Sequence, residues 1–315
     1  MRIELTKREF LDLRLILSGL LRPLKGFMGR DDLEGVLKSR RLKSGHFFPA
    51  PVVLSSKGVE PSRGDRLELI YNGETVGEMV VDETYEWEGN RFISGSMGAE
   101  IKEVTIRDGK IAGYITPGPI YRPEEYVLKA VLEVADKIFI GFVEEAEKEP
   151  LSSKVRRKAT EVLLSQYFPK NRYILRDISY HMRYTKDDYL FHALILRNIG
   201  CSYAIIISGE PREIEDFVEP YRKDLGIDIL VFEKPFYCGR CKTMATDRTC
   251  PHQDRFRVYM EEGRLRDLLR RGHRLPEEFA RPEVGKVIME GFLFGGVSSE
   301  EDKIKKSLKD LGYIE

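Results

Sequence analysis

The chain has 315 residues, more than the about 100 to 200 of a single domain, so its length predicts two or three domains. With 42% hydrophobic and 33% charged residues, the composition excludes an intrinsically disordered protein. Lys plus Arg and Asp plus Glu number 52 each, so the net charge indicates neither nucleic acid nor an anionic membrane as a partner, although a local basic patch stays open. The sequence lacks an apolar run of about 18 residues, and no membrane span is predicted.

The amino-terminal segment carries acidic residues and has no unbroken apolar stretch. It matches neither a secretory signal nor a transit peptide, and we expect a cytoplasmic protein. Three of the four cysteines lie within thirteen residues, which fits a metal site in a reducing compartment better than a disulfide scaffold. High charge with few cysteines is typical of thermophilic proteins.

Residues 1–113 are predicted to form a mostly β domain that also holds one or two helices. Asn72-Gly73 and Asp108-Gly109 each lie between apolar runs, and such pairs predict tight β-hairpin turns. The helical patterns span 6–21 and 30–41, and the alternating strand patterns span 47–56, 65–94 and 103–117.

Residues 114–258 are predicted to form a Rossmann-like α/β domain, because helix and strand patterns alternate from about residue 123. The strand patterns are short and almost wholly apolar, as in a parallel sheet with helices on both faces. Predicted helices span 123–135, 152–168, 186–200 and 213–226, and predicted strands span 137–143, 172–178, 203–209 and 228–233. The remaining segment, 259–315, is predicted to be a small helical region with helices at 260–273 and 300–312 and a loop at 274–284.

A Cys-rich loop at 236–256 holds the ligand types and the ligand number of a closed tetrahedral zinc site. Because four protein ligands leave no position for water, we expect structural zinc. The alternative is a set of free thiols on an exposed loop, which oxidation disfavours. Asp254 or a water molecule are alternatives for the fourth ligand. The predicted ligands are Cys238, Cys241, Cys250 and His252.

Arg183 follows a predicted strand end, where α/β sheets place their ligands, and functional and structural roles are equally open for it. His192 lies near the apolar face of a predicted helix and is interpreted as a hydrogen-bonded histidine of the core or of a domain interface. The turn at 208–211 offers a helix N-terminus to an anion, although it has one glycine only. A basic run is typical of a solvated helix face, with an oxyanion or RNA contact as the alternative, and comprises Arg264, Arg266, Arg270, Arg271 and Arg274.

Six stretches in a fixed order resemble the ATP sulfurylase (sulfate adenylyltransferase) family over nearly the whole chain. They are SGLLRPLKGFMGRDDLEGVL with FFPAPVVL, KATEVLLSQYFPKNRYIL, HMRY, FHALILRNIGCSY, FEKPFYCGRCKTMATDRTCPH and LPEEFARPEV. The resemblance implies a PUA-like β domain, a central nucleotidyltransferase domain, a small carboxy-terminal part and a homodimer. In the branch that carries it, the resemblance also implies zinc at Cys238, Cys241 and Cys250.

The same resemblance aligns the family's ligand-binding loops with segments of this chain whose residues differ from the family motifs. The adenylyl-transfer motif, Gln-x-Arg-Asn-Pro-x-His-x-x-His, aligns with 115–124, where only the proline, Pro119, is kept. Glu124 replaces the second histidine and would place negative charge against a triphosphate. The other rewritten ligand loops lie at 185–188, 208–213 and 261–263, whereas the core and zinc stretches are kept.

We therefore interpret the chain as an ATP sulfurylase-like protein that binds an adenine nucleotide or a related anionic ligand, with sulfate adenylyl transfer doubtful. One alternative is a non-catalytic regulatory protein that binds RNA or a protein through the PUA-like domain or the Arg-rich segment. The other is a genuine sulfate adenylyltransferase with displaced catalytic groups. Arg183 is the first candidate for binding phosphate, and its possible substitutes are Arg122, Arg212 and Arg266.

Overall fold

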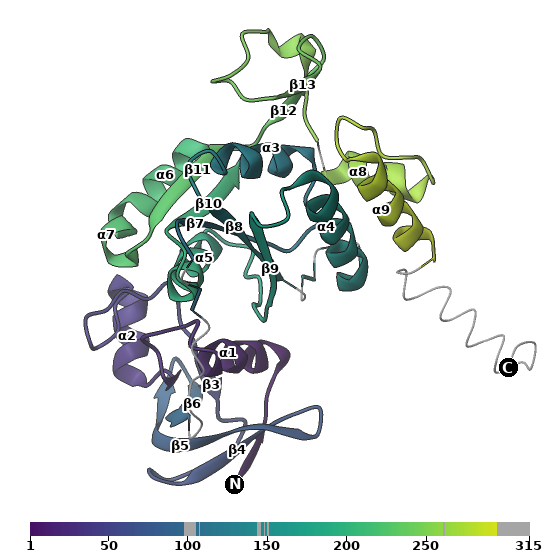
Figure 1. Cartoon of the computed structure of the whole chain (residues 1–315). Helices are drawn as coiled ribbons and strands as arrows, with labels where there is room; N and C mark the ends of the chain where they lie inside the picture. Colours follow the sequence, from purple (N-terminus) through teal and green to yellow (C-terminus); the bar gives the residue numbers. More distant parts are fainter. Residues whose placement is uncertain are drawn as a thin grey trace, which may run out of the picture. The chain divides into compact units, whose positions relative to one another are not determined.

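The structure, a computed structural model, describes residues 1–97, 105–106, 108–143, 146–147, 149, 151–260 and 262–294 (Figure 1). The chain divides into two compact units, each discontinuous in sequence. Unit 1 comprises Met1–Ile115, Ala135–Glu145 and Ile174–Phe232, and unit 2 comprises Thr116–Val134, Ala146–Tyr173 and Glu233–Glu315. These units differ from the three predicted segments, whose independence as domains stays a prediction.

The amino-terminal part of unit 1 is β-rich, as the alternating patterns predict. Its strands are β1 (Arg2–Glu4), β2 (Gly26–Phe27), β3 (Leu54–Ser55), β4 (Arg66–Tyr71), β5 (Glu74–Trp87) and β6 (Asn90–Met97), and its helices are α1 (Lys7–Leu17) and α2 (Arg30–Ser39). The sheet has the order β1-β4-β5-β6-β2, with β3 paired to β6. Between β4 and β5, Asn72 and Gly73 have φ values of 52° and 79°, which confirms the hairpin predicted from this Asn-Gly pair.

The second predicted hairpin is wrong in its strand pairing. β7 (Ile111–Thr116) follows Gly109, but it lies in a separate five-stranded sheet between two strands from later in the chain. Of the preceding predicted strand, residues 103, 104 and 107 lie outside the described residues, and Thr105 and Ile106 are not in a strand. The Asp-Gly turn is formed, with Gly109 at φ 73°, but β10 and β8 take up the two edges of β7.

That five-stranded sheet in unit 1 confirms the predicted α/β architecture. Its strand order is β11-β10-β7-β8-β9, and β7 pairs with β10 in parallel. Since the chain first adds strands on one side of β7 and then on the other, the order reverses between β7 and β10, where open α/β sheets bind ligands outside the strand carboxyl ends. The later strands are β8 (Lys137–Val143), β9 (Tyr173–Ile178), β10 (Tyr203–Ser208) and β11 (Asp228–Glu233). The helices are α3 (Arg122–Val131), α4 (Ser153–Tyr167), α5 (Asp187–Ile199), α6 (Pro211–Val218), η1 (Glu219–Tyr221) and α7 (Arg222–Leu225).

One continuous hydrophobic core joins the β-rich part of unit 1 to its parallel sheet. Phe48 packs edge-to-face against Phe191 of α5, with ring centres 5.9 Å apart, and both rings are fully buried. The side-chain amide of Asn198 donates hydrogen bonds to the carbonyl oxygens of Leu20 (2.8 Å) and Arg22 (3.0 Å). These contacts couple the amino-terminal part to the helix that precedes β10.

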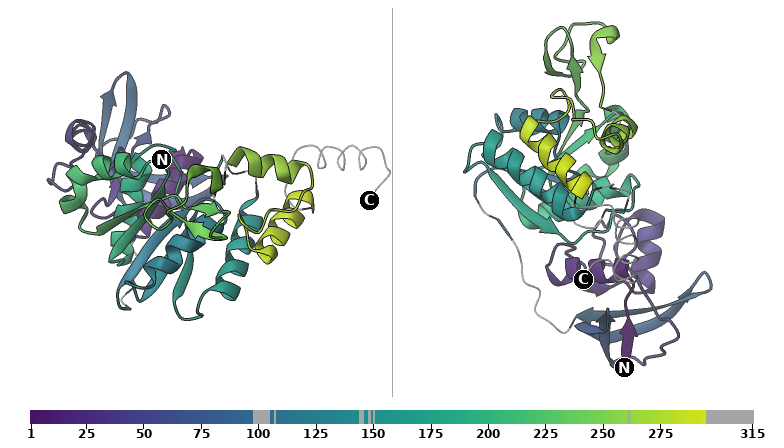
Figure 2. Two further views of the ribbon diagram at one scale, coloured as in Figure 1. Left: turned by 90° about the horizontal axis from the view of Figure 1, so that it is seen from above. Right: turned by 90° about the vertical axis from the view of Figure 1, so that its right-hand side faces the viewer.

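The carboxy-terminal part of unit 2 contains α8 (Glu262–Arg270) and α9 (Pro282–Phe294). Helix α9 runs along α4, as the views of Figure 2 show. It packs closely because Gly291 lacks a side chain: a Cβ there would lie 2.4 Å from Val155 methyl carbons. The sequence reading missed α9, whose proline start is a good helix N-terminus. The predicted helix at 300–312 lies outside the described residues. None of the described helices has the length and apolar character that a membrane crossing requires.

Candidate metal centre and ligand loops

The Cys-rich segment forms a small three-stranded sheet in unit 2 that the sequence reading did not predict. Its order is β13-β12-β14, and both pairs are antiparallel. Cys238 ends the central strand, and the next three residues turn tightly enough for the Lys242 N–H to donate to the Cys238 carbonyl oxygen at 2.7 Å. The strands are β12 (Phe236–Cys238), β13 (Thr243–Ala245) and β14 (Arg257–Val258), with the turn η2 (Asp254–Phe256) before β14.

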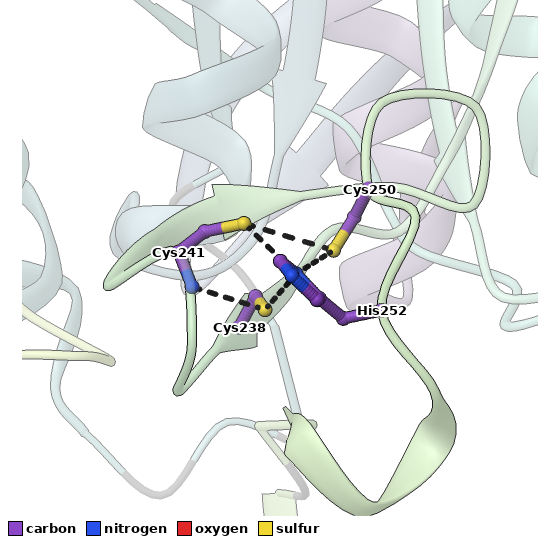
Figure 3. A group of neighbouring side chains, drawn as sticks. All are labelled: Cys238, Cys241, Cys250 and His252. Atoms are coloured by element: carbon purple, nitrogen blue, oxygen red, sulfur yellow. Dashed lines mark hydrogen bonds between the residues drawn. The ribbon is translucent and has the colours of Figure 1, made fainter.

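The four predicted ligands converge in this segment (Figure 3), and their ligand atoms all lie within 4.8 Å of one another. The sulfur atoms of Cys241 and Cys250 are 3.9 Å apart. His252 Nδ1 lies 3.2 Å from the Cys241 sulfur and 3.5 Å from each of the other two cysteine sulfurs. The backbone N–H of Cys241 donates to the Cys238 sulfur at 3.4 Å and lowers the pKa of that thiol to about 6.

These distances fit zinc. With Zn–S near 2.3 Å and Zn–N near 2.0 Å, tetrahedral geometry places sulfur atoms about 3.8 Å apart and sulfur and nitrogen about 3.5 Å apart. The cluster could therefore bind a metal such as zinc through Cys238, Cys241, Cys250 and His252. Asp254, the alternative ligand, is instead 92% exposed and lies 3.1 Å from the guanidinium of Arg257.

The loop that follows β7 has its polar groups paired within unit 2. The Gly118 N–H donates to the Thr116 hydroxyl oxygen at 3.2 Å, and that hydroxyl donates to the Gly118 carbonyl oxygen. The buried side chain of Arg156 donates to the Pro117 carbonyl oxygen. A Cβ on Gly118 would lie 3.5 Å from Glu149 Oε1, so a carboxylate borders the loop. The resemblance described above predicts that this loop aligns with the adenylyl-transfer motif.

At the N-terminus of α3, directly after this loop, the first two backbone N–H groups are also paired within the chain. The Tyr121 N–H donates to the Glu124 carboxylate at 3.1 Å, and the Arg122 N–H donates to the Phe279 carbonyl oxygen at 2.9 Å. Pro123, the next residue, has no N–H. Anion sites at helix N-termini depend on such N–H groups being free. The sequence reading missed this role of Glu124, although a glutamate three residues after a helix start is the signature of a capping box.

The connection after β10, in unit 1, also carries carboxylates at its helix N-terminus. The Glu210 N–H donates to the Ser208 hydroxyl oxygen at 3.1 Å. Glu213 pairs with Lys186, and its hydrogen bond with Glu210 raises the pKa of Glu210. Arg212, a predicted anion ligand, is exposed on the first turn of α6. The negative charge beside it opposes anion binding at this turn.

Arg183 lies in a buried network of unit 1, with its side chain only 8% exposed. Its guanidinium carbon is 3.9 Å from the ring centre of Phe191, and Nη1 donates to the Tyr180 hydroxyl oxygen at 3.0 Å. That hydroxyl donates to Asp188 at 2.5 Å. Nη2 lies 3.7 Å from Asp12, whose pKa burial raises. The sequence reading did not identify these partners, since helices α1 and α5 supply the two aspartates. A phosphate-binding role for Arg183 stays a prediction.

The other predicted residues are distributed over both units. Arg122 in unit 2 is 21% exposed, and its Nε lies 3.7 Å from Glu125. Arg266, also in unit 2, is half-buried on α8. Their ligand roles stay predictions. His192 in unit 1 packs edge-to-face on Tyr180, with a buried Nε2 that has no hydrogen-bond partner among the described residues, and burial lowers its pKa to about 4. The buried position fits the predicted core histidine, whereas Nε2 does not form the predicted hydrogen bond within the described residues.

Comparison with known protein families gives two adjoining matches. A family model described as ATP-sulfurylase matches residues 97–291, and one described as PUA-like domain matches residues 1–103. The chain is 30% identical to a sulfate adenylyltransferase of Symbiobacterium thermophilum, covering 92% of this chain and 88% of that protein. It is 29% identical to a sulfate adenylyltransferase of Chloroflexus aurantiacus, covering 91% and 90% of the two chains.

Among solved structures, the chain is similar to a hexameric APS kinase from Thiobacillus denitrificans, with a TM-score of 0.75 and 18% sequence identity. The match covers 91% of this chain and spans 62% of the length of that one. At this identity the likeness supports the fold alone.

Proposed function

This chain belongs to the ATP sulfurylase family, and we propose that it binds an adenine nucleotide or a related anionic ligand without transferring an adenylyl group to sulfate. The nucleotide part of the proposal rests on family membership and on the reversal of strand order between β7 and β10. The loss of transfer rests on the loop after β7 and on the start of α3.

One observation carries the proposal: the Tyr121 N–H is occupied by the carboxylate of Glu124. The family's adenylyl-transfer motif has histidine at the positions that align with both residues. Here an uncharged phenol and a carboxylate stand in their place, and the helix N-terminus is capped from within the chain. A developing charge on a phosphate would therefore meet negative charge instead of donors.

The energetic cost of this change is large on the scale of catalysis. Hydrogen bonds that involve a charged group contribute about 1.5–3 kcal/mol each. Loss of two such contacts in the transition state would therefore slow the reaction by about two to four orders of magnitude. The repulsion from Glu124 and from Glu149 beside the loop would add to that loss.

Within this proposal, Arg183 is the first residue to test for phosphate binding, followed by Arg122, Arg212 and Arg266. Zinc held at the Cys-rich segment would be structural, because four protein ligands leave no open coordination position. A homodimer is proposed from the family alone, and light scattering of the purified chain would test it.

Thermal stabilisation by nucleotides tests the binding part. A ligand that binds only the folded state raises the melting temperature, by an amount that grows with ligand concentration. We expect ATP, ADP or adenylyl sulfate to raise the melting temperature of the chain, and Arg183→Lys to weaken the effect. An unchanged melting temperature at millimolar nucleotide would contradict the binding proposal.

A genuine sulfate adenylyltransferase with displaced catalytic groups is the second candidate. It is favoured by the relatives that carry that name and that align over about nine-tenths of this chain. In that case groups outside the aligned motif would have to contact the phosphates. Formation of ATP from adenylyl sulfate and pyrophosphate separates the two candidates.

A further inference from the structure

The tip of the Cys-rich segment carries an unusual arrangement of positive charge. In the register of β12 and β14, Cys238 lies opposite Arg257, and the Gly239 N–H donates to the Phe256 carbonyl oxygen at 2.8 Å. The next residues along the two chain segments are Arg240 and Arg255. Two arginines therefore meet at the same end of the sheet, and both side chains are exposed.

Both guanidinium groups approach one aromatic ring. The Cζ atoms of Arg240 and Arg255 lie 5.8 Å and 4.9 Å from the ring centre of Phe256. Lys242, one residue beyond the second zinc-site cysteine, is a third exposed cation on this turn. Like charges facing each other across paired chain segments are destabilising unless a counter-charge is present.

The described part of the chain offers these three cations no such counter-charge. Arg257, next to them, forms ion pairs with Asp247 (2.5 Å) and Asp254 (3.1 Å), but no described carboxylate pairs with Arg240, Lys242 or Arg255. By comparison, Arg91 of β6 is exposed and lies 3.0 Å from Glu86. The tip is therefore a cluster of three exposed cations that form no ion pair within the described residues.

We infer that the tip formed by Arg240, Lys242, Arg255 and Phe256, here called the knuckle tip, binds single-stranded nucleic acid through its phosphates. A small anion favours a concave pocket, whereas the consecutive residues 239–243 are all exposed at the tip. An extended polyanion gains affinity at such a surface by releasing counterions. The half-buried Phe256 ring, which both guanidinium groups approach, offers an aromatic surface against which a base can stack.

The placement differs from the surfaces that the sequence reading considered for RNA. The long strand β5 of the PUA-like domain exposes Glu74, Glu78, Asp82 and Glu86, and this negative charge disfavours RNA there. The Arg-rich helix α8 is the remaining competitor, with Arg270 and Arg271 exposed. The inference is independent of the nucleotide proposal, because it uses none of the loops after β7, β9 and β10.

Fluorescence anisotropy with a labelled oligouridine RNA tests the inference on the full chain with its zinc content verified. Arg240→Glu/Arg255→Glu should weaken binding tenfold or more at about 100 mM salt and lower the salt slope of log K by about 1.4, since each phosphate contact to a single strand contributes about 0.7. The matched control Lys43→Glu/Arg63→Glu, which makes the same charge change at exposed residues of unit 1, should bind nearly as wild type. Melting temperature and zinc content show that each variant is folded.

Three results would overturn the inference. Equal losses of RNA affinity in the knuckle-tip variant and in the control would show that the effect depends on net charge alone. A selective loss in Arg270→Glu/Arg271→Glu would move the contact to α8. Binding of pyrophosphate to the tip by calorimetry, without any binding of RNA, would show that the tip takes free phosphate groups only.

Discussion

The backbone N–H of Tyr121 and the carboxylate of Glu124 form a hydrogen bond of 3.1 Å that caps α3 from within the chain. In the alignment on which the proposal rests, both residues take positions where the family motif has histidine. The structure gives Glu124 a stabilising role in the helix, and the proposal adds that the same carboxylate opposes the approach of a phosphate. A single substitution can separate these two effects.

Glu124→Ala should lower the free energy of unfolding by about 1 kcal/mol through loss of the cap, and should strengthen nucleotide binding severalfold by removing a negative charge. Chemical denaturation and nucleotide titration measure the two quantities. Glu133→Ala, at an exposed position beyond the other end of α3, is the matched control and should change neither. Weaker nucleotide binding in Glu124→Ala would contradict a repulsive role for Glu124.

The sequence predicted those parts of the molecule that local patterns determine. The Asn72-Gly73 turn and the alternation of α5 with its flanking strands are set by backbone preferences and by apolar periodicity, and the structure confirms them. The four predicted zinc ligands lie so close in the chain that two short turns bring them together. In this segment, the sequence spacing was sufficient to predict that the four side chains converge.

What the sequence did not predict depends on contacts between distant segments. The Asp108-Gly109 pair looked like a hairpin turn, but the pairing of β7 is decided by strands that follow it much later in the chain. Likewise, the surroundings of Arg183 include Asp12 from α1, a helix near the start of the chain. Helix α9 was not predicted because its apolar residues are buried by packing against α4, a helix distant in the sequence.

The metal centre should hold about one zinc ion per purified chain. Cys250→Ser should abolish that zinc and lower the melting temperature, since structural zinc contributes directly to folding. Elemental analysis and calorimetry measure the two effects. Cys201→Ser is the matched control: Cys201 is buried away from the cluster, and burial raises the pKa of its thiol to about 12. It should retain full zinc, and zinc loss in that variant instead would contradict the assignment.

Arg281 forms an ion pair in unit 2 with the buried carboxylate of Glu125, with nitrogen-to-oxygen distances of 2.7–3.2 Å. Arg281→Ala should cost about 2 to 3 kcal/mol of stability, because it leaves the Glu125 carboxylate buried with less compensation. Lys286→Ala, which removes an exposed pair at 3.8 Å, should cost about 0.5 kcal/mol or less. Equal effects in urea denaturation of the two variants would contradict the importance of burial.

The ion pair of Arg281 and Glu125 also predicts how the stability of the protein depends on pH. Burial raises the pKa of Glu125, but hydrogen bonds from Arg281 and Lys129 outweigh that effect and hold it below its ordinary value. A carboxyl with a lowered folded-state pKa stabilises the protein above its unfolded pKa of about 4.3, and the contribution is lost as the pH falls through the folded value. Arg281→Ala should therefore reduce the loss of stability on acidification below about pH 4.3.

His192 predicts a second loss of stability on acidification, in a pH range above that of Glu125. Its pKa falls to about 4 through burial, so the unfolded chain binds a proton first as the pH drops below about 6.5. Stability should decrease between about pH 6.5 and 4, by up to about 3 kcal/mol from this residue. His192→Leu should flatten that part of the profile, whereas the same change at exposed His273 should not. An identical slope in wild type and His192→Leu would contradict a neutral buried ring.

The most direct measurement is formation of ATP from adenylyl sulfate and pyrophosphate by the folded chain with its zinc content verified. We predict no turnover above background, because Glu124 and the capped start of α3 stand where the family motif provides phosphate donors. Turnover that requires both substrates would contradict the proposed loss of sulfate adenylyl transfer, and it would identify the chain as a sulfate adenylyltransferase that uses other residues.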